Sequence, residues 1–291
     1  LFSNHIQSNK LLHLAKDIRH RGPDNTICHS TSMGTFVFHR LMINHMSNNG
    51  NQPIVDGDIT LVCNGEIYNW KELKSEYKIS SYTSDSDCEI ILHLFKMGKN
   101  INEICSLLDG VFAFILTTKS NVYAARDPLG VRPLYIYTND EHVTIASETK
   151  VIPFNDKTYF KPGHSWSSKT GYSQYDTTFC RENVLFDEEK IVHLLEKAVC
   201  KRLHCDAPIG FFLSGGLDSS LVAAIGNKYL GSIKTFSIGL QGGNSPDLQN
   251  AKIVAETLNS DHTEVLFTAE EGIQALHSVV YALETYDITT I

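Results

Sequence analysis

The stretch Ile209-Gly-Phe-Phe-Leu-Ser-Gly-Gly-Leu-Asp-Ser-Ser220 joins an apolar run, a glycine loop and the start of a helical pattern. Strand, loop and helix in this order form a phosphate cradle, because the glycines let the backbone approach an anion closely. Free N–H groups at the helix start then point toward that anion. Ser214, Ser219 and Ser220 can donate to phosphate oxygens, and Asp218 can hold a magnesium ion through its carboxylate.

This glycine loop lacks the Lys of a G-x-x-x-x-G-K-[ST] sequence, so it is not a Walker site. A tight turn with Ser as the helix N-cap is the alternative, and such a turn needs no ligand. The complete string from Ser214 to Ser220 favours nucleotide binding. It resembles the pyrophosphate loop of ATP pyrophosphatases, which split ATP into AMP and pyrophosphate to activate a carboxyl or carbonyl group.

Strand and helix patterns alternate after residue 186. This alternation predicts a parallel sheet in a doubly wound domain, whose ligands bind beyond the carboxyl ends of the strands, where Leu213 lies. We expect helices at 188–203, after the glycine loop, at 246–258 with Ser245 as N-cap, and from a capping box at Thr268 and Glu271, with strands at 209–213, 234–240 and 262–267.

The preceding part of the chain is rich in strand patterns. One helix is expected at 10–19, and another starts at Ser86, where Ser86 and Glu89 form a capping box. These patterns predict stacked sheets with helices on the outside, and a linker near 175–186 separates two domains, 1–180 and 181–291. The expected strands are 35–43, 59–68, 110–118, 121–127, 133–138 and 142–148.

The composition is that of a globular protein in a reducing compartment. Among 291 residues, 42% are hydrophobic and 20% are charged, which excludes a disordered chain. A net charge of -8 disfavours binding to nucleic acid or to a membrane surface. The seven cysteines form no C-x-x-C pair, so we expect free thiols, no zinc site and a cytoplasmic protein. The sequence has no apolar run of transmembrane length and no visible signal peptide.

Five short strings in the first domain are each explained by turn or helix-start chemistry when taken alone. Together they resemble the glutaminase domain of the N-terminal-nucleophile amidotransferases across most of residues 19–150. They are Arg19-His-Arg-Gly-Pro-Asp24, His39-Arg-Leu41, Asn64-Gly-Glu-Ile-Tyr-Asn69, Ser86-Asp-Cys-Glu89 and Arg126-Asp-Pro-Leu-Gly-Val-Arg-Pro-Leu-Tyr135.

Combined with the glycine loop, these strings resemble the glutamine-hydrolysing asparagine synthetases. Thr235-Phe-Ser-Ile-Gly239, Ser245-Pro-Asp247 and the segment from Glu284 to Ile291 are similar to that family too. The resemblance implies an α/β chain: an αββα stacked-sheet domain of the N-terminal-nucleophile hydrolase type, then a truncated, doubly wound ATP pyrophosphatase domain.

The same resemblance implies which residues bind the substrates. Glutamine has a carboxylate that suits the Arg40 guanidinium and an ammonium that suits Asp87, while Asn64 and the Gly65 N–H would stabilise the oxyanion formed at the amide. The implied glutamine pocket is Arg40, Ile43, Asn64, Gly65, Glu66 and Asp87. The implied ATP site, with Mg²⁺ at Asp218, is Leu213, Ser214, Gly215, Gly216, Asp218, Ser219 and Ile238. The implied aspartate pocket contains Asp287, Thr289 and Thr290.

The sequence departs from the family at the nucleophile. In the family this is a Cys at the mature N-terminus whose own α-amino group is the base. This sequence begins with Leu1, and no Cys precedes Arg19. As written, the chain is not expected to hydrolyse glutamine, and both ends indicate a piece of a longer protein.

The expected function is therefore that of the parent synthetase. It would amidate aspartate through an aspartyl adenylate, using ATP, Mg²⁺ and ammonia released from glutamine, and the resemblance implies a homodimer. One alternative is a β-lactam-forming synthetase, which naturally lacks the N-terminal Cys. The other is a catalytically dead relative that binds ligands or a partner.

Overall fold

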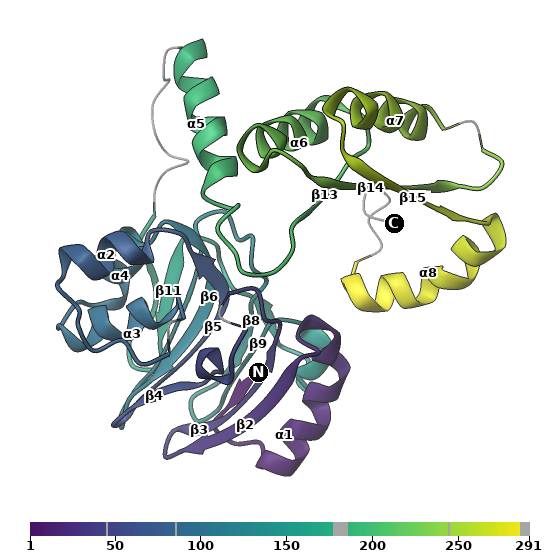
Figure 1. Ribbon diagram of the computed structural model, residues 1–291. Coiled ribbons are helices and arrows are strands. Elements are labelled where there is room, and N and C mark those ends of the chain that lie inside the picture. Colours follow the sequence, from purple (N-terminus) through teal and green to yellow (C-terminus); the bar gives the residue numbers. More distant parts are fainter. Residues whose placement is uncertain (45, 85, 177–185, 244, 286–291) are drawn as a thin grey trace. The chain divides into compact units, whose positions relative to one another are not determined.

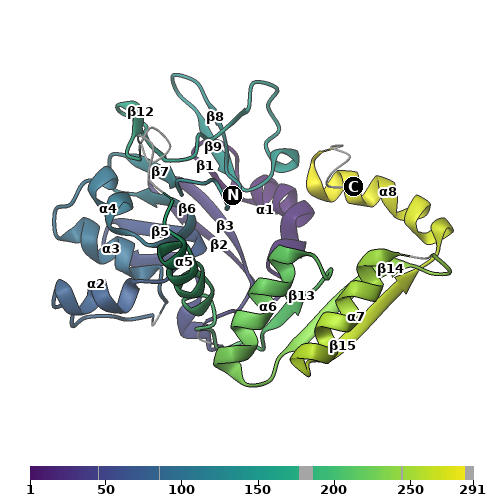
Figure 2. The ribbon, with the colours of Figure 1, turned by 90° about the horizontal axis from the view of Figure 1, so that it is seen from above.

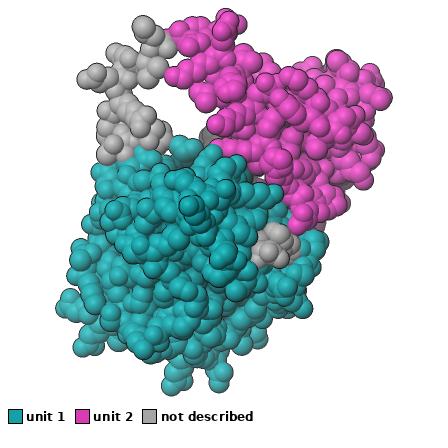
Figure 3. Space-filling model, turned by 60° about the vertical axis from the view of Figure 1, so that its left-hand side comes forward, with its two compact units in different colours: residues 1–183 teal, residues 184–291 magenta. Residues whose placement is uncertain are grey.

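The computed structural model describes residues 1–44, 46–84, 86–176, 186–243 and 245–285. The chain divides into two compact units, residues 1–183 and 184–291, which are coloured separately in Figure 3. Each unit has its own sheets and its own core. Among the described residues, no helix has both the length and the apolar character needed to cross a membrane.

The first unit contains two six-stranded sheets whose strand pairs are all antiparallel. The first sheet has the order β10 (Thr158–Tyr159), β8 (Tyr135–Thr138), β9 (Val143–Ala146), β1 (Phe2–Ser3), β3 (Gly34–Arg40) and β2 (Asn25–Thr31). The second has the order β12 (Gly171–Gln174), β11 (His164–Ser167), β7 (Val122–Arg126), β6 (Gly110–Thr117), β5 (Ile59–Ile67) and β4 (Ile54–Asp56).

The two sheets of this unit pack face to face. Phe2 and Phe36 of the first sheet share a buried cluster with Val62 and Ile115 of the second. Because side chains alternate along a strand, the neighbouring Cys63 points to the opposite face of the second sheet, where it packs in the cluster that includes the helices α2 (Trp70–Glu76), α3 (Glu89–Lys96) and α4 (Ile101–Leu107).

The first sheet is covered on its outer face by α1 (Ser8–Ala15), whose Leu11 and Ala15 pack with Val37 of β3. The unit therefore has four layers, helix, sheet, sheet and helix, as predicted (Figures 1 and 2). Short 3-10 helices lie at Lys16–Arg21, Asn48–Gly50 and Thr149–Val151.

The six strands predicted for this unit are present, with ends shifted by up to three residues. The predicted capping box of Ser86 and Glu89 is wrong. Cys88 is the N-cap of α3, and the Glu89 carboxylate instead accepts hydrogen bonds from Thr83 and Ser84. The boundary predicted at 180/181 lies within residues 177–185, outside the described part of the chain.

The second unit alternates helices and strands, and its three strands are parallel in the order β13 (Gly210–Phe212), β14 (Lys234–Leu240) and β15 (Asp261–Phe267). The predicted parallel sheet is thus confirmed. Its helices are α5 (Glu188–Cys200), α6 (Leu217–Leu230), α7 (Pro246–Leu258) and α8 (Ala269–Leu283), and the last begins with the predicted capping box of Thr268 and Glu271. Phe211 and Leu213 pack with α6 and α7 through Ala223, Ala251 and Ala255.

Candidate functional site

A cavity of about 320 Å³ opens in the first unit where β3 and β5 end. Its wall also includes the segment after β3 and the turn before α3. All six residues predicted for the glutamine pocket line this cavity: Arg40, Ile43, Asn64, Gly65, Glu66 and Asp87. Residues from three separate parts of the sequence are therefore brought together as expected.

The C-terminal half of β5 has one backbone edge that faces this cavity. The N–H groups of Cys63 and Ile67 donate to Gln52 Oε1 at 2.6 Å and to Asp87 Oδ2 at 2.7 Å, so both point away from β6. Since N–H groups alternate along a strand, the Gly65 N–H points to the same side, between these two bonds. The Gly65 N–H thus lies on the strand edge that lines the cavity.

Asn64 adds a side-chain donor beside this backbone N–H. Within the described part of the chain, Asn64 Nδ2 is buried without a hydrogen-bond partner. Such a donor costs free energy unless a ligand satisfies it. A side chain cannot replace the neighbouring Gly65, because an added Cβ would lie 2.3 Å from the Val111 carbonyl oxygen and 2.7 Å from Phe112 Cα. Asn64 Nδ2 and the Gly65 N–H are thus two hydrogen-bond donors in residues that line this cavity.

Arg40 ends β3 and is almost fully buried. Its Nη1 donates to the Ser47 carbonyl at 2.7 Å and to Asn51 Oδ1 at 2.9 Å, and its Nη2 donates to the Asn44 carbonyl at 3.3 Å. Burial lowers the pKa of Arg40 and the Asp24 carboxylate opposes this, but a guanidinium stays charged at neutral pH. Arg40 thus holds the following loop and places a positive charge at the cavity.

Asp87 provides an opposing negative group at the same cavity. Burial raises the pKa of Asp87, the hydrogen bond from the Ile67 N–H opposes this, and the Glu66 carboxylate adds to the rise, so that the pKa is about 6. A cation that binds next to a buried carboxylate stabilises its ionised form. The cavity can therefore accept a ligand with an anionic and a cationic group.

In the second unit, the glycine loop follows β13 at the carboxyl end of the sheet, as predicted. Gly215 has a φ of +75°, and an added Cβ would lie 2.4 Å from backbone atoms of Asn250 and Ala251. Ser214 Oγ and Ser219 Oγ lie 3.0 Å apart across the loop. This close packing against α7 requires glycine and fixes the path of the loop.

The N-cap of α6 is Gly216, which has no side chain to satisfy the first N–H groups of the helix. An anion can take that role, so the loop fits a phosphate. Asp218 is exposed in the first turn of α6. The described residues contain no group of three His, Cys, Asp or Glu side chains able to hold a metal, so any ion at Asp218 would need oxygens from its ligand.

Two further predicted positions are described in this unit. Leu213 is buried, and Ile238 on β14 is 68% exposed. Asp287, Thr289 and Thr290 lie outside the described residues.

Residues 1–174 match the family model described as the glutamine amidotransferase domain, which covers more than half of the chain. The chain belongs to the glutamine amidotransferase domain family. Residues 190–291 match the model described as asparagine synthase.

Curated relatives extend the match over both units of the chain. Asparagine synthetase [glutamine-hydrolyzing] of Zea mays is 41% identical over 97% of the chain and 51% of the relative. Asparagine synthetase [glutamine-hydrolyzing] 2 of Arabidopsis thaliana is 39% identical over 99% of the chain and 53% of the relative. These matches confirm the resemblance inferred from the motifs, and the chain spans about half the length of these relatives.

A solved structure supports the fold. The match to glutamine phosphoribosylpyrophosphate amidotransferase from B. subtilis, complexed with ADP and GMP, covers 80% of this chain and 64% of that chain, with a TM-score of 0.51 and 21% identity. At that identity the likeness shows the fold alone.

The motifs missed one buried residue, Gln52, that shapes the wall of this cavity. Gln52 donates from Nε2 to the Cys63 carbonyl at 3.1 Å and accepts from the Cys63 N–H, so its side chain pairs with the backbone of β5 like a strand. It holds the residue before Asn64 in place. Nothing local in the sequence marks it, because its partner lies eleven residues away.

Proposed function

We propose that the natural protein is a glutamine-hydrolysing asparagine synthetase whose first unit releases ammonia from glutamine. The observation that carries this proposal is the buried, unpartnered Asn64 Nδ2 beside Gly65, in a cavity that also contains Arg40 and Asp87. The succession of the two family models along the chain supports it.

Glutamine binds in this proposal with its α-carboxylate at Arg40 and its ammonium at Asp87, with Ile43 and Glu66 completing the wall. The amide oxygen then lies at Asn64 Nδ2 and the Gly65 N–H. Attack on the amide carbon makes that oxygen an anion, and the two donors stabilise it in the transition state.

The family places the nucleophile on an N-terminal Cys that uses its own amine as base. The Leu1 nitrogen donates to the Val37 carbonyl at 3.0 Å, and the Val37 N–H donates to the Leu1 carbonyl at 2.8 Å. With this antiparallel register, a residue that precedes Leu1 in the natural protein would continue β1 alongside β3 toward Arg40. That path supports delivery of the nucleophile to the cavity.

The second unit contributes the ATP site in this proposal. Leu213 and Ile238 would contact adenosine, and Ser214, Gly215, Gly216 and Ser219 would hold the pyrophosphate at the start of α6. Mg²⁺ would bind Asp218 together with phosphate oxygens. The aspartate pocket would include Asp287, Thr289 and Thr290. ATP activates the aspartate carboxyl as an adenylate with release of pyrophosphate, and ammonia displaces AMP to give asparagine.

We further propose that the protein works in the cytoplasm as a homodimer, without nucleic-acid or membrane partners. The resemblance to the synthetases and the net charge of -8 support this.

The test is product analysis with the full-length natural protein, supplied with aspartate, ATP, Mg²⁺ and either glutamine or ammonium. The proposal expects equal amounts of asparagine, glutamate, AMP and pyrophosphate from glutamine. Asparagine formed from ammonium but not from glutamine would contradict the glutaminase assignment. A protein that binds glutamine and ATP without forming asparagine would favour the dead relative.

A further inference from the structure

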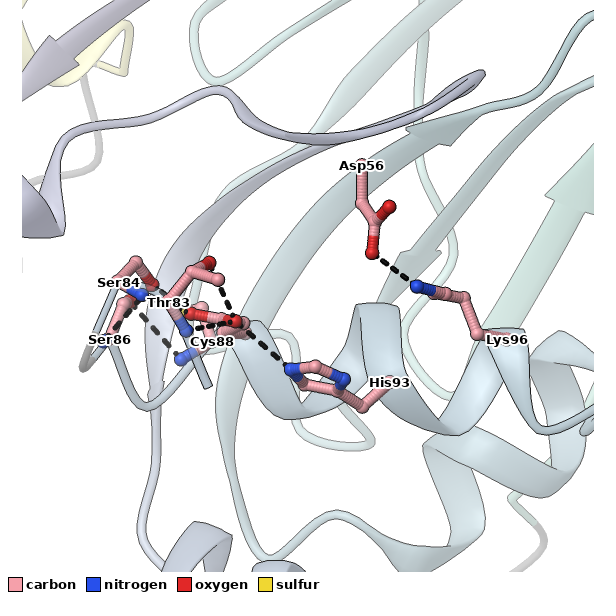
Figure 4. A network of polar contacts seen from close by, with 8 residues as sticks. Asp56, Thr83, Ser84, Ser86, Cys88, His93 and Lys96 are labelled. Atoms are coloured by element: carbon pink, nitrogen blue, oxygen red, sulfur yellow. Dashed lines mark hydrogen bonds and ion pairs between the residues drawn. The ribbon is translucent and has the colours of Figure 1, made fainter. Parts of the chain in front are cut away.

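Glu89 is the first residue of α3, two residues after Asp87, and its carboxylate is buried. It accepts hydrogen bonds from the Thr83 N–H at 2.8 Å, Thr83 Oγ1 at 3.0 Å and the Ser84 N–H at 2.6 Å, and a further short one from Ser84 Oγ. His93 Nε2 lies 2.9 Å from the same carboxylate. Figure 4 shows Thr83, Ser84 and Ser86 gathered at the start of α3, with His93 pointing toward them from the next turn.

The hydrogen bonds continue from Glu89 to the residue beside Asp87. Ser84 Oγ accepts from the Ser86 N–H at 3.2 Å, and Ser86 Oγ accepts from the Cys88 N–H at 3.3 Å. The Glu89 N–H donates to the Ser86 carbonyl at 3.0 Å. The Ser86 N–H is thus linked to the Glu89 carboxylate through Ser84 Oγ, and the Cys88 N–H is held in turn by Ser86 Oγ.

We propose that Glu89, held by His93, is a positioning residue that sets the Asp87 carboxylate for the ammonium group of an amino-acid substrate. This inference rests on the proposed glutaminase function. Asp87 has two anchors: the Ile67 N–H on β5 and the turn that Glu89 fastens. Loss of the second leaves the side chain held by the Ile67 N–H and by the long contact from Cys88 Sγ at 3.8 Å, and its carboxylate then samples positions outside the productive geometry.

The hydrogen bonds that Glu89 accepts need an ionised carboxylate. Burial raises the pKa of Glu89, but the hydrogen bonds from Ser84, Thr83 and His93 outweigh burial and hold the pKa below its ordinary value. An ionised carboxylate only accepts, which matches the donors around it. In Glu89→Gln, an NH₂ group replaces one of these acceptors and faces donors.

The experiment compares steady-state kinetics of variants of the full-length natural protein. Glu89→Gln is expected to raise the KM for glutamine by about tenfold with a smaller change in kcat, because binding is misaligned while the oxyanion donors are intact. Asp87→Ala serves as the reference for complete loss of the ammonium ligand. The matched control is Lys96→Gln at the end of the same helix, which breaks the ion pair of Lys96 with Asp56 of β4, also drawn in Figure 4.

The control differs from Glu89 in exposure. The side chains of Lys96 and Asp56 are 43% and 45% exposed, against 2% for Glu89 and 8% for His93. Lys96→Gln is therefore expected to leave the KM for glutamine within twofold of the natural value.

Three results decide the inference. If Asp87→Ala raises the KM for glutamine and Glu89→Gln does not, the positioning role is wrong and the proposed function stands. If Asp87→Ala has no effect on glutamine use, the proposed function itself fails. If Glu89→Gln lowers glutamine-dependent and ammonia-dependent synthesis equally, its effect is not specific and the inference fails.

A second pair of variants covers the case in which Glu89→Gln does not fold. His93→Leu removes one donor and is expected to raise the KM for glutamine by a few fold, whereas His93→Gln keeps a donor and restores the natural value. Equal KM values in the two variants would overturn the proposal.

Discussion

The Ile67 N–H donates to the Asp87 carboxylate at 2.7 Å, which joins the strand that carries Asn64 and Gly65 to the turn that begins α3. Donors for an oxyanion and an acceptor for an ammonium are thus parts of one hydrogen-bonded unit. Their separation is set by the backbone, so a single substrate can meet both at once. This arrangement fits pre-organised recognition of an amino acid with a side-chain amide.

The raised pKa of Asp87 predicts a stability cost for the empty site. An Asp with a pKa of about 6 when folded and 3.8 when unfolded binds protons more tightly in the folded state. Stability is therefore lost as pH rises from about 4 to 6, by about 3 kcal/mol in total. Asp87→Asn keeps an acceptor for Ile67 and removes this cost.

We expect Asp87→Asn to raise the melting temperature above pH 6 and to abolish glutamine binding. Thermal unfolding of both proteins at pH 4 and pH 7.5 measures this. The two melting temperatures should converge at pH 4, and an Asp87→Asn protein that is less stable at pH 7.5 would contradict the expectation.

Asn64→Ala removes the side-chain donor of the proposed oxyanion pair. The kcat for glutamine hydrolysis is expected to fall by about 10²- to 10³-fold, with little change in KM, since the donor acts on charge that develops in the transition state. Glutamate release by the full-length protein is the readout. A rise in KM at constant kcat would show that Asn64 only binds the substrate.

Gly215→Ala tests the phosphate loop, and Gly231→Ala is its matched control. The two glycines have φ values of +75° and +73°, but nothing lies within 4 Å of a Cβ at Gly231. Both substitutions cost about 1 kcal/mol for the left-handed backbone. Only Gly215→Ala collides with Asn250 and Ala251 of α7.

ATP binding to the two variants can be compared by calorimetry with the full-length protein. Gly215→Ala is expected to weaken binding by at least tenfold, while Gly231→Ala binds as the natural protein does. Equal affinities would contradict the placement of the phosphates at this loop.

Several elements were predictable from the sequence because their signals are local. The strands β5 and β6 are long and enriched in apolar residues, and the glycine loop lies between a strand and a helix. The strand β2 was missed because its sequence, Asn25-Thr-Ile-Cys-His-Ser-Thr31, is mostly polar. It alternates between exposed and half-buried positions, so it needs few apolar residues.

Long-range hydrogen bonds account for what the sequence could not predict at the site. Gln52 reaches the backbone at Cys63, and Glu89 turns back to Thr83 and Ser84 where a capping box with Ser86 was expected. Gln52 satisfies backbone groups on the free edge of β5, and Glu89 satisfies backbone groups in the turn before α3. Such partners are decided by the folded path of the chain and leave no periodic pattern.

In the proposed function, nitrogen moves from the glutamine amide to aspartate in the natural protein. The most direct measurement supplies L-glutamine labelled with ¹⁵N in its amide, together with aspartate, ATP, Mg²⁺ and excess unlabelled ammonium, and follows the label by mass spectrometry. We expect ¹⁵N in the side-chain amide of the asparagine formed. Asparagine that carries only unlabelled nitrogen, or no asparagine at all, would contradict it.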